Sequence, residues 1–215
     1  MHTRKTLGRR GFDLRWTTGT ALMVAMTLVL GNTPLGLITM PFLTATTLHI
    51  PVIIATLTLG LASGIVTGFV FGVQSFLNSF SSPTFFGPFF INPLVSVLPR
   101  VLFPMVVFAV SEWAVKLTAS FDRRKRIACF AASALGTVAH TVMVMGMIYL
   151  LYGGKISQMI NSGTGVPAAL TERGVGLGIA ALAVANGLPE VIVACVIAPV
   201  IVLALRRAFG AAGEV

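Results

Sequence analysis

The chain has 215 residues, of which 56% are hydrophobic and 10% are charged, and its formal net charge is +9. A soluble domain carries about 25% charged residues, so this composition excludes an ordinary soluble protein and requires burial in lipid. The two cysteines, Cys129 and Cys195, lie far apart in apolar runs, so we expect neither a disulfide framework nor a paired-cysteine metal site.

Basic residues gather in three places along the chain: at 4–15 before the first apolar run, at 116–126, and at 206–207 after the last run. Nucleic-acid binding would need such clusters on one folded face together with base-stacking aromatic residues. Clusters that flank apolar runs instead follow the positive-inside rule of membrane proteins. We therefore expect no nucleic-acid partner, and we interpret residues 1–15 as a basic cytoplasmic N-terminal segment.

Six apolar runs are candidates for transmembrane helices. They cover about 16–32, 49–61, 63–79, 93–117, 127–151 and 174–205. Four runs separate the first two basic clusters and two more precede the third, so all three clusters can lie in the cytoplasm. The longer loops, 33–48, 80–92 and 152–173, then lie outside. We predict an all-α integral membrane protein, a single domain over 1–215, with a six-helix transmembrane bundle and both termini cytoplasmic.

Small residues form two stripes on the predicted helices. Ala21 and Ala25 lie one helical turn apart on the first. Another stripe recurs every four residues and consists of Gly60, Gly64, Gly68 and Gly72. Such a stripe lets another backbone approach closely. It could be a surface for a partner, or it could provide ordinary packing within the bundle, and we favour the packing.

Arg100 and Glu190 are charged residues inside predicted spans, and no carboxylate lies within ten residues of Arg100. Burial of an ionised side chain in hydrocarbon costs several kcal/mol or more of free energy unless an opposite charge or polar groups compensate it. The two could neutralise each other as a structural pair, or they could line a pocket for a polar anionic solute, and we favour the pocket. Further polar side chains in or beside the spans are Gln74, Asn78, Asn92, His140 and Asn186.

Several motifs of catalysis are absent from the sequence. It contains no G-x-x-x-x-G-K-[ST] loop for ATP and no H-E-x-x-H zinc motif. His140 has no second ligand at metal-binding spacing, and a lone histidine in a span is more often a helix–helix hydrogen bond. We expect no catalytic residues, no cofactor and no metal.

Four stretches resemble the substrate-binding S components of energy-coupling factor (ECF) transporters. "TTLHIPVIIATLTLG" (46–60) and "GIVTGFVFGVQSFLNSF" (64–80) resemble the family's second and third helices. "SPTFFGPFFINPLVSVLPRVLFP" (82–104) resembles its third loop and fourth helix, and "NGLPEVIVACVIAPVIVLAL" (186–205) its sixth helix. The Ala21-x-x-x-Ala25 pair fits the alanine motif of its first helix.

The resemblance implies a high-affinity, vitamin-binding subunit of an ATP-driven importer in a prokaryotic plasma membrane. Its partners would be the vitamin, membrane lipid, and an energy-coupling module of one transmembrane coupling protein and two ATPase subunits. ATP would be hydrolysed on those partners. The first helix would dock on the coupling protein through Ala21 and Ala25.

The stretch "NPLVSVLPR" (92–100) and the threonine-rich first loop (33–48) most resemble pantothenate-type members of the family. The resemblance thus implies pantothenate or another small anionic vitamin as the solute. Pantothenate has one carboxylate, which Arg100 could bind. Its hydroxyl and amide groups would meet the other candidate binding residues, Asn92, Gln74, Asn78, His140, Asn186 and Glu190. A stand-alone channel or secondary carrier for a small solute is the alternative, although the inverted repeats frequent in carriers are not visible in the sequence.

Overall fold

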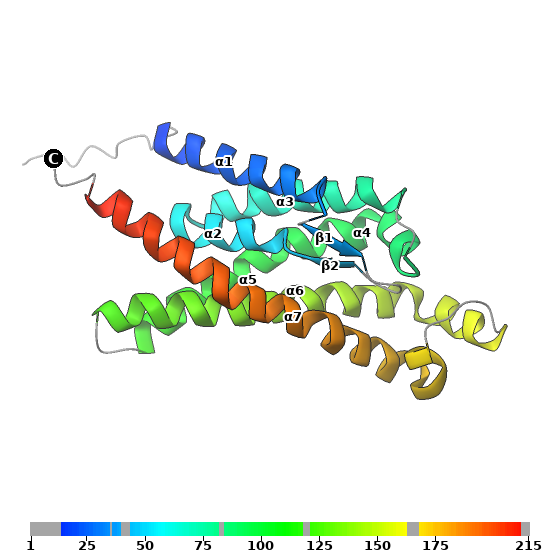
Figure 1. Cartoon of the computed structure of the whole chain (residues 1–215). Helices are drawn as coiled ribbons and strands as arrows, with labels where there is room; N and C mark the ends of the chain where they lie inside the picture. The colour runs from blue at the N-terminus through cyan, green and yellow to red at the C-terminus, as the bar shows by residue number, and fades with distance from the viewer. Residues whose placement is uncertain are drawn as a thin grey trace, which may run out of the picture.

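The computed structural model describes residues 14–34, 36–39, 44–81, 84–117, 121–162 and 168–211. This part of the chain is helical almost throughout (Figure 1). The main helices are α1 (Leu14–Gly31), α2 (His49–Leu59), α3 (Leu61–Ser79), α5 (Leu98–Leu117), α6 (Phe121–Asn161) and α7 (Ala168–Ala211). The short elements are the strands β1 (Leu37–Thr39) and β2 (Thr44–Thr46), the 3-10 helix η1 (Gly87–Ile91) and the four-residue helix α4 (Pro93–Ser96).

Five helical stretches in the described residues are long and apolar enough to cross a membrane. They are Leu14–Gly31, Leu61–Ser79, Pro93–Lys116, Arg126–Asn161 and Gly174–Arg206. The sixth apolar helix, α2, has 11 residues. At 1.5 Å per residue it is about 17 Å long, roughly half of a bilayer core of about 30 Å. The prediction of an α-helical membrane protein is confirmed, and each predicted apolar run corresponds to one of these helices.

Helix α2 lies at the centre of the bundle because it is apolar on all sides. All of its residues from His49 to Leu57 are buried, and it contacts α1, α3, α5, α6 and α7. Gly60 separates it from α3 with φ +98°, a backbone conformation that suits glycine. Gly60 is therefore the one residue that connects these two helices.

The ends of the last two long helices differ from the prediction. Residues 152–173 were expected to form a loop, but α6 continues to Asn161 and α7 begins at Ala168. The prediction was wrong because it ended the helix where the apolar run ends, whereas a helix of 41 residues, about 62 Å long, extends well beyond a bilayer core. Non-helical backbone angles inside α7 occur at Gly174, and the helix continues through Pro189 and Pro199.

The glycine stripe of α3 packs against neighbouring helices of the same chain. A Cβ atom at Gly64 would overlap the Thr56 side chain of α2. One at Gly68 would overlap the carbonyl oxygen of Arg100, and one at Gly72 would lie 2.8 Å from the Cα atom of Val97. These contacts confirm that the stripe provides close packing within the bundle.

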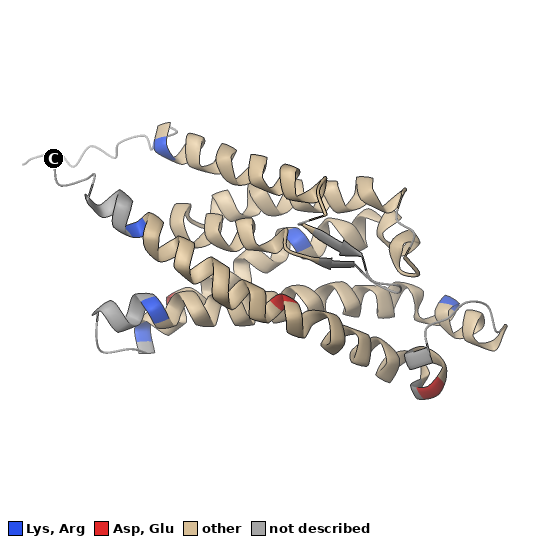
Figure 2. Ribbon diagram, in the orientation of Figure 1, with Lys and Arg blue, Asp and Glu red and all other residues tan. Residues whose placement is uncertain are grey.

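Charged residues lie mainly at the two ends of the bundle (Figure 2). We call one the basic end, where α1 starts, α5 ends, α6 starts and α7 ends (Figure 1). Its described basic side chains are Arg15, Lys116, Arg126 and Arg206. We call the other the far end, where α6 ends and α7 starts, and the antiparallel β1–β2 hairpin lies between α2 and α4, nearer the middle (Figure 1). Arg100 and Glu190 lie between the ends.

Candidate functional site

The sequence Asn92-Pro93 fixes the local structure that carries Arg100. The Asn92 side chain accepts a hydrogen bond from the Leu94 backbone N–H at 3.0 Å, and Pro93 takes the first position of α4. Asparagine and proline are favoured at these two positions of a helix start. The chain turns at Val97, so Arg100 falls in the first turn of α5.

Arg100 is buried, with 4% of its surface exposed. Its Nη1 group donates to the carbonyl oxygen of Val95 at 2.7 Å, but its Nε group has no hydrogen-bond partner. The guanidinium carbon lies 5.3 Å from the ring centroid of Phe71 and 5.0 Å from that of Phe90. Two aromatic faces and one carbonyl oxygen thus attract the cation, while the Nε–H donor is left without a partner.

Two buried histidines lie beside Arg100. The rings of His49 and His140 are stacked, with centroids 6.0 Å apart and an interplanar angle of 16°. Phe71 links this pair to Arg100, because its ring centroid lies 5.6 Å from that of His140. On another side, Phe103 lies 5.1 Å from His140. Neither ring nitrogen of either histidine has a hydrogen-bond partner.

Glu190 of α7 binds the first loop. Its Oε1 atom accepts a hydrogen bond of 2.7 Å from the backbone N–H of Thr46, at the end of β2. No carboxylate oxygen in the described residues lies within 4.0 Å of a nitrogen of Arg100, although the charges of Arg100 and Glu190 interact at longer range. A direct Arg100–Glu190 ion pair is therefore not formed. Asn186, one turn from Glu190 on α7, is buried, and its Oδ1 atom has no partner.

The unpaired polar atoms of this region are the chief indication of a binding site. Buried polar atoms without hydrogen bonds are rare in folded proteins, and each costs about 1–3 kcal/mol. In the described part of the chain they are Nδ1 and Nε2 of His49, Nε of Arg100, Nδ1 and Nε2 of His140, and Oδ1 of Asn186. We call Arg100, His49, His140 and Asn186 the buried polar cluster: Phe71 links the first three, and Asn186 lies one turn from Glu190, whose charge interacts with that of Arg100. It combines one cationic donor, two imidazoles and one amide, which suits a small anion with further polar groups.

Gln74 and Asn78 are used in contacts between α3 and the end of α1. Gln74 Nε2 donates to Asn78 Oδ1 at 3.0 Å and to Asn32 Oδ1 at 3.4 Å. Asn78 Nδ2 donates to the carbonyl oxygen of Gly31 at 2.8 Å. These bonds give both amides a structural role, and their binding of a solute stays a prediction.

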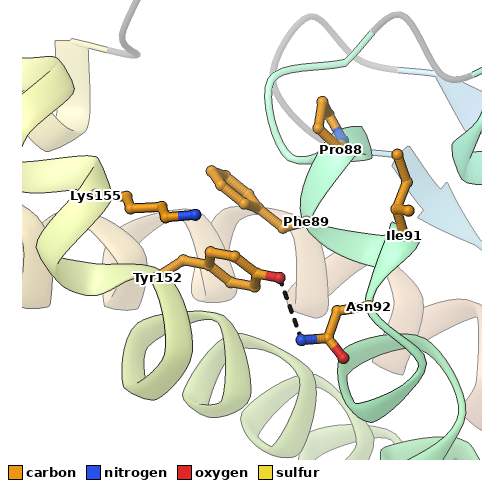
Figure 3. A pocket seen from close by; sticks show the side chains of 6 residues that line it. All are labelled: Pro88, Phe89, Ile91, Asn92, Tyr152 and Lys155. Atoms are coloured by element: carbon orange, nitrogen blue, oxygen red, sulfur yellow. Dashed lines mark hydrogen bonds between the residues drawn. The ribbon is translucent and has the colours of Figure 1, made fainter.

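A second concave site lies at the far end of the bundle, and Asn92 lines it. The cavity has a volume of about 470 Å³ (Figure 3). Its lining residues are Pro88, Phe89, Ile91, Asn92, Tyr152 and Lys155. Asn92 Nδ2 donates to the hydroxyl of Tyr152 at 3.2 Å, so the extended end of α6 is joined to η1 and α4 here.

The outer surface of α1 carries the two alanines of the predicted docking motif. Ala21 and Ala25 are both exposed, and so are the apolar side chains of Leu22 and Val29. The opposite side of α1 packs on α3, where Thr20 donates to the Ser63 hydroxyl at 2.9 Å. The stripe is thus available to another membrane protein or to lipid.

The polar groups of these sites that were not predicted from the sequence are those of His49, Thr46, Tyr152 and Lys155. His49 carried a usable signal, since it is a polar residue at the start of an apolar run. Thr46 contributes its backbone N–H, which any residue would provide, so its type gave no indication. Tyr152 and Lys155 were assigned to a loop and not to the helix that positions them.

The sequence matches the family model described as "ECF transporter, substrate-specific component" over residues 17–202. The chain belongs to this family. The resemblance noted from the sequence is thereby confirmed, as is the prediction of a transporter component. Among curated proteins, the chain is similar to the pantothenic acid transporter PanT of Lactococcus lactis subsp. cremoris (strain MG1363). The two are 27% identical over 179 residues, which are 76% of this chain and 78% of PanT.

Proposed function

We propose that this S component binds a small anionic vitamin, namely pantothenate, with high affinity at the buried polar cluster. The observation that carries the proposal is the Nε group of buried Arg100, an unpaired cationic donor beside the unpaired nitrogens of His49 and His140. A carboxylate on Arg100 would form a charge-assisted hydrogen bond and neutralise the cation.

The remaining chemistry of the cluster supports pantothenate within this class of solutes. Pantothenate carries an amide and hydroxyl groups besides its single carboxylate, so it offers hydrogen-bond donors and acceptors for the imidazoles and for Asn186 Oδ1. Phe71, Phe90 and Phe103 surround these groups with apolar surface. The similarity to PanT supports the same solute.

The proposed topology places the basic end in the cytoplasm of a prokaryotic cell and the far end outside, as the positive-inside rule favours. All six helices would lie in the plasma membrane, with the short α2 enclosed by the others and lipid around the bundle. The mouth of the cavity, with η1 beside it, would then face the medium from which the vitamin is taken. Both termini would lie inside the cell.

The partners in transport would be a transmembrane coupling protein and two ATPase subunits. ATP would be hydrolysed on those subunits, and this chain would act as the binding subunit and not as an enzyme. The exposed stripe of Ala21 and Ala25 would contact the coupling protein, because small side chains permit close helix approach.

Reconstitution separates this function from that of a stand-alone channel or carrier. The purified chain alone should bind radiolabelled pantothenate in detergent but should not accumulate it in proteoliposomes. Adding the coupling protein, the ATPases and ATP should start uptake. Uptake by the chain alone, driven by a solute or ion gradient, would instead establish a carrier.

A further inference from the structure

The cavity at the far end has the size and the chemistry of a ligand site. Its volume of about 470 Å³ lies within the roughly 300–1,000 Å³ of small-molecule pockets. It opens between η1–α4 on one side and the end of α6 on the other. Phe89 and Tyr152 form an aromatic wall, with ring centroids 4.8 Å apart, and the Asn92 amide and the Tyr152 hydroxyl meet beside it.

Lys155 gives this cavity a positive charge. Its Nζ atom lies 5.6 Å from the centroid of the Tyr152 ring, and Figure 3 shows the amine directed toward Phe89 and Tyr152. No carboxylate of the described residues comes within 4.0 Å of this amine. The charge is therefore attracted by an aromatic face and is available to an incoming anion.

Helix η1 separates this cavity from the buried polar cluster. Two consecutive residues of η1 serve the two sites: Phe89 lines the cavity, and the Phe90 ring centroid lies 5.0 Å from the guanidinium carbon of Arg100. The 3-10 helix η1 has five residues, and its hydrogen-bond geometry is poorer than that of an α-helix. Lys155 and Arg100 are thus cations on the two sides of this short segment.

We propose that the cavity is a capture site for the carboxylate of the solute, occupied before the solute reaches Arg100. The ligand class is a small organic monocarboxylate with hydroxyl or amide groups. The ammonium group of Lys155 attracts the carboxylate, while Asn92 and Tyr152 meet a hydroxyl or amide. Displacement of η1 then opens the route to the cluster. This inference rests on the proposed function, since it assigns the same solute to both sites.

A capture site acts on the rate of association. An exposed charge steers an oppositely charged ligand and raises its association rate, and salt screens the effect. Lys155 contacts neither the free solute nor the solute bound in the buried cluster, so its removal should leave the equilibrium dissociation constant unchanged. Lys155→Gln should therefore slow association of pantothenate about 3- to 10-fold at low ionic strength and slow dissociation by the same factor.

The kinetic experiment uses the purified full-length chain in detergent and radiolabelled sodium pantothenate. Lys116→Gln is the matched control, because Lys116 is an exposed lysine at the basic end. It should leave the association rate at the wild-type value. The difference between Lys155→Gln and wild type should vanish at high salt. Pantothenyl alcohol, which has a hydroxymethyl group in place of the carboxylate, should associate equally fast with both proteins. An unchanged association rate in Lys155→Gln would overturn the capture site and leave the proposed function standing.

A second readout does not depend on the buried cluster. The chain has four lysines, at positions 5, 116, 125 and 155. The NMR spectrum of reductively dimethylated protein therefore contains few lysine signals. The signal that disappears in Lys155→Arg is that of Lys155. Sodium pantothenate at millimolar concentrations should shift the Lys155 signal even in Arg100→Ala, and pantothenyl alcohol should not. Absence of the shift in Arg100→Ala would overturn the inference. A shift together with wild-type affinity in Arg100→Ala would instead refute the buried site and retain the capture site.

Discussion

Removal of the Arg100 guanidinium should abolish the preference for a carboxylate. Arg100 is 4% exposed and has one unpaired donor, so a bound carboxylate would form a desolvated, charge-assisted contact. Truncating one partner of such a contact costs about 2–5 kcal/mol, and about 1.4 kcal/mol corresponds to a tenfold change in affinity. Pantothenate should therefore bind Arg100→Ala roughly 30- to 4,000-fold more weakly than it binds the wild type.

The assay compares two ligands and two proteins in one cycle. Isothermal titration calorimetry should show that the wild type binds pantothenate roughly 30- to 4,000-fold more tightly than it binds pantothenyl alcohol. In Arg100→Ala the two ligands should bind within about threefold of each other, because the charge contact is already absent. Arg100→Lys should recover part of the preference, since a point charge lacks the planar donor arrangement. Thermal unfolding of each variant controls for loss of folding.

Two outcomes would refute this reasoning. If Arg100→Ala still prefers the acid by the wild-type factor, the carboxylate does not contact Arg100. If the variant is merely destabilised and Arg100→Ala/Glu190→Ala regains both stability and pantothenate binding, Arg100 serves to balance the charge of Glu190.

Three further predictions concern packing, docking and topology. Gly68→Ala should destabilise the protein by about 1–3 kcal/mol in thermal or denaturant unfolding, since its Cβ meets the Arg100 carbonyl. Gly146→Ala should be neutral or stabilising by up to about 1 kcal/mol, because nothing lies within 4 Å of its Cβ; equal effects of both substitutions would contradict the packing. Ala25→Trp should abolish uptake by the reconstituted transporter while pantothenate binding to the purified chain stays within about twofold, and parallel loss of both would assign the alanine to folding. In a cysteine-free background, Lys155→Cys should react with an impermeant maleimide added to whole cells and Arg126→Cys only after lysis, and the reverse pattern would overturn the proposed orientation.

The membrane helices could be predicted from sequence because hydrophobicity is a local property of each run. All six apolar runs correspond to helices in the structure, including the short α2. The error at 152–173 arose because a helix that leaves the bilayer loses its apolar signal but keeps its backbone hydrogen bonds. Gly153 and Gly154 lie inside α6.

The candidate site was only partly visible in the sequence. Arg100 was identifiable because a charge within an apolar run is costly, and the same reasoning found Glu190 and His140. The partner of Glu190 was not predictable, since it is the Thr46 backbone N–H, 144 residues away along the chain. The stacking of His49 on His140 likewise depends on the packing of α2 against α6. Sequence reasoning found the groups that need partners, whereas the fold determines which partners they have.

A structure of the purified chain determined in the presence of pantothenate tests the central claim most directly. The account predicts the vitamin inside the bundle, with its carboxylate within hydrogen-bonding distance of Arg100 Nε and its other polar groups on His49, His140 or Asn186. Pantothenate bound elsewhere, with the Arg100 Nε group and both histidines still unpaired, would contradict it.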